Sequence, residues 1–163
     1  MTTLTNFFLA NEDLYIDDDV RLIGETRIVG GSLTVTGKIT LDHDDKTHAN
    51  LIIKDGDLTA YEILSKHCDN ISVEGSIYVN YGIYVFGCNI DAYNIYTTCL
   101  NADGVTVSFD ILFTTGNLIE LYCKRDCYIE TVCNFNNGAL QVDGKFCGCA
   151  SNVNTMLIGC GTF

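Results

Sequence analysis

The stretch NISVEGSIYVNYGIYVFGCNIDAYNIYTTCLNADGVTVS, residues 70–108, decides the fold. It divides into short units, and each unit holds two apolar or small residues separated by a single residue. Residues two apart in an extended chain point to the same side. The stretch therefore predicts brief strands whose inward-facing pairs are Ile71/Val73, Ile77/Val79, Ile83/Val85, Ile90/Ala92, Ile95/Thr97, Leu100/Ala102 and Val105/Val107.

The spacing of these units limits how they can be connected. Successive units begin five to seven residues apart, which leaves no room for the strands of a hairpin meander. A helix is also excluded, because the β-branched residues cluster and the apolar period is two. A chain that turns a corner after each unit, with three or four units in a coil, fits both observations. We predict an all-β fold, a right-handed β-helix (solenoid) of short strands with 5–7-residue units.

The same pattern extends over most of the chain, which at 163 residues has the length of one domain. Earlier pairs such as Leu33/Val35 and Leu51/Ile53 continue it toward the N-terminus. We expect a single domain, 1–163, with an N-terminal cap at 1–19, coils at 20–144, a polar loop at 42–50 and a C-terminal cap at 145–163. Caps are expected because an open solenoid end exposes unpaired backbone groups.

Two known families share parts of this pattern. The five-residue step of NIDAYNIYTTCLNADGVTVS, residues 89–108, resembles pentapeptide-repeat proteins, which form right-handed β-helices. The units GDLTAYEI and EGSIYV resemble those of bactofilin-like solenoids, which polymerise end to end. The first resemblance also implies an alternative function, an acidic mimic of duplex DNA that inhibits a DNA-handling enzyme.

Composition excludes several classes of partner. The net charge is −12 and the pI is near 4.3, which argues against binding to nucleic acid or to anionic lipid. The chain has no apolar run of about 18 residues that would span a membrane. The first residues, MTTLTNFFLANEDLY, lack the basic region of a secretory signal, so we expect a cytoplasmic protein. The nine cysteines are then expected to be mostly reduced.

The outward positions of the central units carry the candidate binding site. Between Ile71 and Val107 there is no Lys or Arg, and tyrosine recurs at outward or corner positions. Exposed aromatic side chains often mark partner surfaces. The expected function is a non-enzymatic structural, scaffold or protein-binding role, with self-association through this face or the terminal turns. The candidate partner-binding residues are Tyr78, Tyr81, Tyr84, Phe86, Tyr93 and Tyr96.

Two groups of residues raise the question of a metal site. His43, Asp44, Asp45 and His48 include ligand types that suit zinc, although a solvated polar loop holds the same residues. Cys147 and Cys149, with Cys160 nearby, lack the two-residue gap of zinc knuckles. Residues two apart on a strand share a face, so we interpret these two cysteines as core residues. We expect no metal and no cofactor.

Candidate catalysis is equally limited. His67 and Cys68 are adjacent, so on a strand they would point in opposite directions, and no third orienting group is evident. A second alternative function is a hexapeptide-type acyltransferase, which needs a histidine base at a subunit boundary. All three histidines lie in the irregular loops. We therefore predict no catalytic residues.

Overall fold

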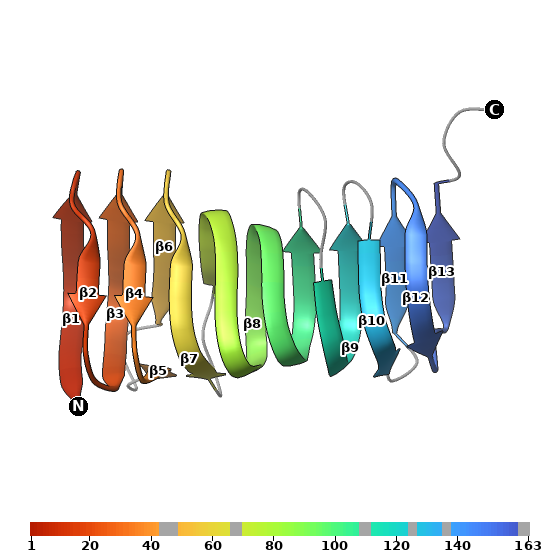
Figure 1. The fold of residues 1–163 in the computed structure, drawn as a ribbon, viewed down its shortest axis with the longest axis horizontal. Coiled ribbons are helices and arrows are strands. Elements are labelled where there is room, and N and C mark those ends of the chain that lie inside the picture. The colour runs from red at the N-terminus through yellow and green to blue at the C-terminus, as the bar shows by residue number, and fades with distance from the viewer. Residues whose placement is uncertain (43–48, 66–69, 108–111, 124–126, 135–137, 160–163) are drawn as a thin grey trace.

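The computed structural model describes residues 1–42, 49–65, 70–107, 112–123, 127–134 and 138–159, which form a solenoid of parallel strands (Figure 1). Every strand pairing within these ranges is parallel, and they contain no helix, so the predicted all-β solenoid is confirmed. The strands are β1 (Thr2–Ala10), β2 (Leu14–Ile16), β3 (Val20–Val29), β4 (Leu33–Val35), β5 (Lys38–Asp42), β6 (Asn50–Lys54), β7 (Leu58–Ser65), β8 (Asn70–Val107), β9 (Leu112–Cys123), β10 (Cys127–Asn134), β11 (Ala139–Val142), β12 (Phe146–Ser151) and β13 (Thr155–Ile158).

The coil has three sides, as the pairing of β3 shows. The first half of β3 pairs with β5, while its second half pairs with β6. The strand therefore bends between two sides, and the bend falls at Gly24, whose positive φ of 71° suits glycine. The third side begins with β2 and β4, which pair with each other.

The length of one coil follows from the register of the strands. Thr2 pairs with Val20 and Val20 pairs with Ile39, so the first coils take 18 and 19 residues. The coil is shorter further on, where Leu112 pairs with Tyr96, 16 residues before it. Three sides with one unit each account for a coil of this length. The predicted loop at 42–50 follows Asp42, the last residue of β5, and its residues 43–48 lie outside the described ranges.

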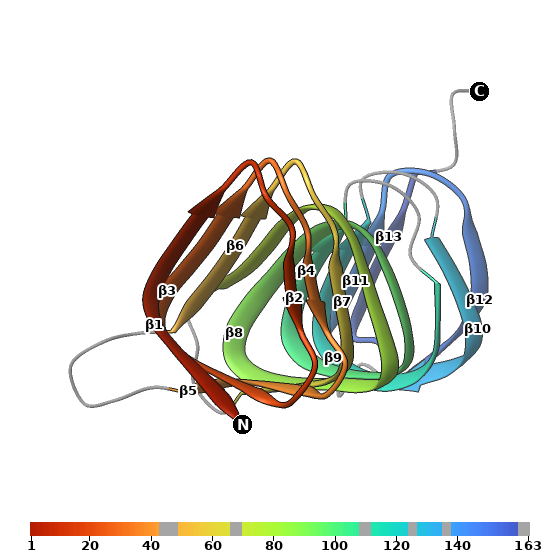
Figure 2. The same cartoon turned by 60° about the vertical axis from the view of Figure 1, so that its left-hand side comes forward.

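The solenoid is right-handed, as Figure 2 shows. That view brings the end with β1 forward. Seen from there, the chain rises through β1, crosses over and descends through β2, and then recedes to β3, so it runs clockwise away from the viewer. The predicted handedness is confirmed.

The core is a column of apolar side chains from all three sides, and it confirms the inward assignment of those strand pairs whose side chains are described. Each such residue is less than one tenth exposed. Stacking of like residues in successive coils produces the column: Ile63 pairs with Ile83, and Leu58 with Ile77. The predicted residues buried in it include Leu33, Val35, Leu51, Ile53, Ile71, Val73, Ile77, Val79, Ile83, Val85, Ile90, Ala92, Ile95, Thr97 and Leu100.

Both ends of the described chain are coils of the same solenoid. Residues 1–19, where the sequence suggested a cap, contain β1 and β2, which pair with β3 and β4. Toward the other end, β12 pairs with β10 and β13 pairs with β11. Within the described ranges, no helix has the length and apolarity needed to cross a bilayer.

Candidate functional site

The predicted tyrosines gather on one side of the solenoid and around its edge. Tyr78 and Tyr96 occupy the same outward position in successive coils, between inward-facing neighbours. Their rings are stacked, with centroids 5.0 Å apart and an interplanar angle of 6°. This distance is close to the spacing of about 4.8 Å between neighbouring strands. The coil geometry itself therefore brings the two rings into contact.

A second group of rings lies at the adjoining corner. Tyr61 and Tyr81 are stacked with centroids 5.7 Å apart and an interplanar angle of 10°. The ring of Tyr84, on the next side, is tilted by 48° against Tyr81 at 6.3 Å. We call Tyr61, Tyr78, Tyr81, Tyr84 and Tyr96 together the tyrosine surface. It wraps around a corner instead of covering one flat side.

Tyr61 was missed by sequence reasoning. The sequence does contain a pattern that could have identified it. Tyr61 directly follows the inward pair Leu58/Ala60, and Tyr81 follows the inward pair Ile77/Val79 with one residue between. Recognising the stack requires the coil length, since 20 residues separate the two tyrosines. Tyr61 also precedes the central units, from Ile71 to Val107, on which the candidate site was predicted.

The two remaining candidates are placed differently. Tyr93 is exposed and adjoins Asn94, whose side-chain amide donates to Ser76 Oγ at 3.3 Å. It therefore lies at another corner of the coil, away from the row of Tyr78 and Tyr96. The side chain of Phe86 lies outside the described part of the structure.

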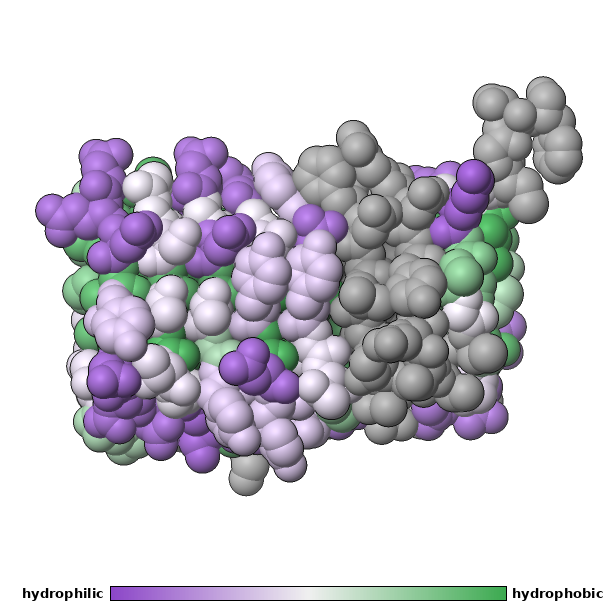
Figure 3. All heavy atoms as spheres, in the orientation of Figure 1, coloured by the Kyte–Doolittle hydropathy of each residue, from purple (hydrophilic) through white to green (hydrophobic). Residues whose placement is uncertain are grey.

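Toward the N-terminus the row through Tyr78 holds threonine in the next two coils and tyrosine again only in the first coil. Register places Tyr15, Thr34, Thr59 and Tyr78 at successive outward positions along it. Figure 3 shows pale, weakly hydrophilic side chains over β7 and β8, whereas strongly hydrophilic residues gather over the N-terminal strands. On β3, one of those strands, the side chains of Arg21 and Arg27 form ion pairs with Asp42 and Glu25.

Tyr84 has the most altered ionisation on this surface. Burial raises the pKa of Tyr84 to about 12, and the negative charge and hydrogen bonding of Cys99 add to the shift, followed by Tyr81 and Glu62. Gly82 makes room for the ring, because a Cβ atom at this position would lie 2.7 Å from the Tyr84 hydroxyl oxygen. Tyr84 therefore stays a neutral hydrogen-bonding group throughout the physiological range.

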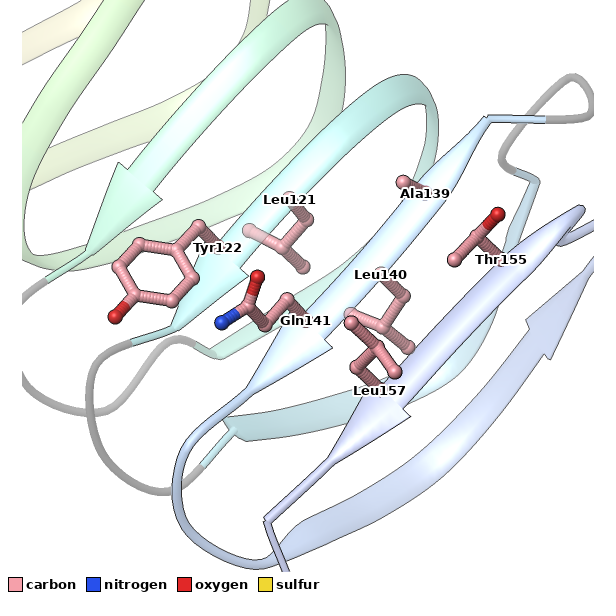
Figure 4. Close-up of a pocket in the computed structure, with 7 residues that line it drawn as sticks. All are labelled: Leu121, Tyr122, Ala139, Leu140, Gln141, Thr155 and Leu157. Atoms are coloured by element: carbon pink, nitrogen blue, oxygen red, sulfur yellow. The ribbon is translucent and has the colours of Figure 1, made fainter.

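A shallow groove lies on the C-terminal coils, and Figure 4 shows its lining. Its volume is about 310 Å³, and among its lining residues Leu121 and Leu140 are buried in the core while Leu157 is exposed. Beside it, the Tyr122 hydroxyl donates to Asp143 Oδ2 at 2.7 Å, which raises the pKa of Tyr122. The seven lining residues include neither a histidine, a cysteine nor a carboxylate, so they provide no acid–base pair. They are Leu121, Tyr122, Ala139, Leu140, Gln141, Thr155 and Leu157.

The metal and nucleophile candidates are mostly beyond what the structure describes. His43, Asp44, Asp45, His48, His67, Cys68 and Cys160 lie outside the described residues, as does the side chain of Cys149. Cys147 is exposed, so the interpretation of this residue as a core thiol is wrong. Among the residues that the structure describes, no three His, Cys, Asp or Glu side chains are grouped to hold a metal ion.

These features define the chain as a parallel β-solenoid protein with an exposed tyrosine surface. Comparison with known proteins found no matching family model, no matching curated protein and no matching solved structure. The similarity to pentapeptide-repeat and bactofilin-like solenoids therefore concerns the architecture of stacked coils.

Proposed function

We propose that this chain is a non-enzymatic scaffold protein that binds a protein partner through the tyrosine surface, with a second copy of the chain as the first partner to test. The observation that carries the proposal is the pair of ring stacks, Tyr78 on Tyr96 and Tyr61 on Tyr81, on the outside of the solenoid. Tyr61, Tyr78, Tyr81 and Tyr96 are between 37% and 53% exposed, so a partner would find ring edges and hydroxyl groups accessible.

Stacking also favours binding thermodynamically. Each ring limits the rotation of its neighbour, so less side-chain entropy remains to be lost when a partner binds. Tyrosine provides a large apolar area together with a hydroxyl group, which is why it is enriched at protein interfaces. The surrounding units from Ile71 to Val107 contain no Lys or Arg, and charged residues are depleted from interface centres in the same way.

Mimicry of duplex DNA is a weaker alternative. A mimic needs regular rows of free carboxylates, whereas the row from Tyr15 through Thr34 and Thr59 to Tyr78 contains none. Several acidic side chains instead hold the coils together. Asp13 Oδ1, Asp19 Oδ1 and Asp57 Oδ1 accept hydrogen bonds from the backbone N–H groups of Ser32, Lys38 and Ser76, at 2.7–2.8 Å.

We place this function in the cytoplasm, where a reducing environment keeps thiols unpaired. Cys99 and Cys147 are free thiols in the structure and are compatible with this location. Expression of the chain in reducing and oxidising compartments would test it through the yield of folded protein. A requirement for oxidation would contradict the assignment.

Self-association can be tested with a double variant and a matched control. We expect Tyr78→Ser combined with Tyr96→Ser to shift the protein toward the monomer in size-exclusion chromatography with light scattering. Tyr15→Ser should leave the mass unchanged, because Tyr15 is 64% exposed in the same row but lies coils away from the stack. An equal decrease in mass in the double variant and in Tyr15→Ser would argue against association through the tyrosine surface.

If the wild type is monomeric, the partner is another protein, and capture from the native cell replaces the mass measurement. Proteins retained by the wild type and by Tyr15→Ser, but lost with the double variant, would be ligands of the tyrosine surface. Retention of the same proteins by all three baits would refute the proposal.

A further inference from the structure

Strand β1, in front in Figure 2, has one open edge. It pairs with β3 on one side, and no described strand pairs with its other side. The N–H and C=O groups of successive residues in a strand point to opposite edges. Asn11 N–H donates to Val29 O at 2.8 Å, so alternate residues back along the chain from Asn11 face β3. The backbone groups of Phe8 and Ala10 therefore point to the open edge.

The hydrophobic column is also incompletely covered at this end. Phe7 pairs with Thr26 and Leu9 pairs with Ile28, so the side chains of Phe7 and Leu9 continue two inward-facing rows. Thr26 and Ile28 are fully buried, whereas Phe7 and Leu9 are only partly buried, because no described coil lies over them. A strand added to the open edge would cover both rows with its own inward-facing side chains.

The open edge lacks the residues that usually protect an edge strand. Natural edge strands often carry charged side chains or proline, which prevent another strand from pairing with them. Residues 2–10, TTLTNFFLA, contain neither. The register with β3 shifts between Thr5 and Phe7, and it is continuous from Phe7 to Ala10. This four-residue segment is therefore suited to the addition of a strand from a partner.

The charge beside this edge indicates the kind of partner. Residues 2–19 contain five Asp or Glu and no Lys or Arg. Glu12 precedes Leu14 by two residues, as Gly31 precedes Leu33, the pairing partner of Leu14. A Cβ atom at Gly31 would lie 2.1 Å from the Glu12 carbonyl oxygen, so it points toward the preceding coil. The side chain of Glu12 accordingly leaves toward the open end, where a basic residue of the partner would meet it.

We propose that β1 binds an extended segment of another protein. The segment adds as a parallel strand along Phe7–Ala10, with apolar residues facing inward and a basic residue beside Glu12. The parallel direction continues that of β1 and β3. A second copy of the chain is a poor occupant, because each copy carries a net charge of −12 and the same acidic end. The inference is independent of the tyrosine surface, to which β1 contributes no residue.

The probe is the peptide acetyl-TRIVKK-amide. Its first four residues are those with which β3 pairs with Phe7–Ala10, and its lysines extend toward Glu12. In this register the isoleucine N–H would donate to the Phe8 carbonyl oxygen, whereas the arginine N–H points away from β1. Two control peptides therefore carry an N-methyl group, one on the isoleucine nitrogen and one on the arginine nitrogen. A third control, acetyl-TRIVEE-amide, reverses the charge.

Binding is measured by nuclear magnetic resonance on the isotope-labelled Tyr78→Ser/Tyr96→Ser variant, so that association through the tyrosine surface does not contribute. We expect saturable shifts of the Phe8 and Ala10 amides with acetyl-TRIVKK-amide. Methylation of the isoleucine nitrogen should weaken binding about tenfold, the effect of one lost hydrogen bond, and methylation of the arginine nitrogen should leave it unchanged. The absence of shifts, or equal affinity of the two methylated peptides, would overturn the proposal.

The role of Glu12 is tested in the same titration. Glu12→Gln should weaken binding of acetyl-TRIVKK-amide about threefold, as expected for an exposed ion pair. Glu74→Gln is the matched control, because Glu74 is exposed at the same corner in a later coil, beside Gly75, and it should leave the affinity unchanged. Equal affinity for acetyl-TRIVEE-amide would overturn the choice of a basic partner. Shifts of Phe8 and Ala10 that grow with protein concentration, without peptide, would identify a second copy as the occupant and also overturn the proposal. Failure of the tyrosine proposal would appear separately, in the mass of the double variant.

Discussion

Asp57 Oδ1 accepts a hydrogen bond from the backbone N–H of Ser76 in the next coil, with 2.7 Å between the two atoms. Asp57 N–H in turn donates to Ser32 Oγ in the preceding coil. One residue thus joins three coils at a corner, where the strand ladder is interrupted. Asp13, Ser32, Asp57 and Ser76 together form a side-chain ladder at this corner.

The first prediction concerns this link. Asp57→Ala leaves the Ser76 N–H without its acceptor, and we expect the free energy of unfolding to fall by about 1 kcal/mol, a typical value for an exposed hydrogen bond. Asp57→Asn keeps an acceptor oxygen, so its free energy of unfolding should fall by less. Urea denaturation of the three proteins measures the difference. A larger loss for the Asn variant than for the Ala variant would show that the carboxylate acts by another route.

The second prediction concerns a polar group in the core. Thr26 is fully buried, and its hydroxyl has no hydrogen-bond partner among the described residues. Leaving such a group unsatisfied costs roughly 1–3 kcal/mol. Thr26→Val replaces the hydroxyl by a methyl group of similar size, so we expect stability to rise by about 1 kcal/mol. Thr34→Val, on the outward row, is the control and should change the melting temperature little.

The third prediction concerns pH. The pKa of Tyr84 is raised from 10.0 to about 12, so the folded chain holds this proton more tightly than the unfolded chain. The resulting stability is fully present below pH 10 and is lost as the pH rises toward 12. We expect the phenolate absorbance of the wild type to include a late phase from Tyr84 near pH 12, in addition to the upward-shifted titration of Tyr122. Tyr84→Phe should remove that late phase and flatten the fall in stability over this range.

Cysteine 99 supplies the matched control for this titration. Its charge and hydrogen bonding raise the pKa of Tyr84, although less than burial does. Cys99→Ser should therefore bring the late phase to lower pH without abolishing it. A late phase that is identical in Tyr84→Phe and in the wild type would assign it to a different tyrosine.

The local pattern was sufficient to predict which residues face inward. Ile77 and Val79 are separated by one residue, and in any extended strand they share a side, so their burial needs no knowledge of the rest of the coil. The length of a coil is a different matter. It depends on how many residues each corner takes, and the glycines that recur at one corner, Gly31, Gly56 and Gly75, are unevenly spaced along the chain.

The contacts between coils could not be predicted either, because they depend on the coil length. Gly31, Gly56 and Gly75 are spaced by 25 and then 19 residues, because the segment between β5 and β6 lengthens one coil. Their alignment, and that of Tyr61 with Tyr81, appears only once the register is known. The exposure of Cys147 was not predicted either, because two cysteines separated by one glycine fit an inward pair as well as an outward one.

The opposite placement of β1 and β13 along the long axis has a mechanical consequence (Figure 1). The hydrogen bonds between coils run nearly parallel to the line joining these strands, so a pulling force applied there would load them in tension and break them a few at a time. Each coil of 16–19 residues that peels away would lengthen the tether by roughly 60 Å. Under tension the protein would therefore yield in small, regular steps at low force, in contrast to domains whose terminal strands must shear past one another all at once.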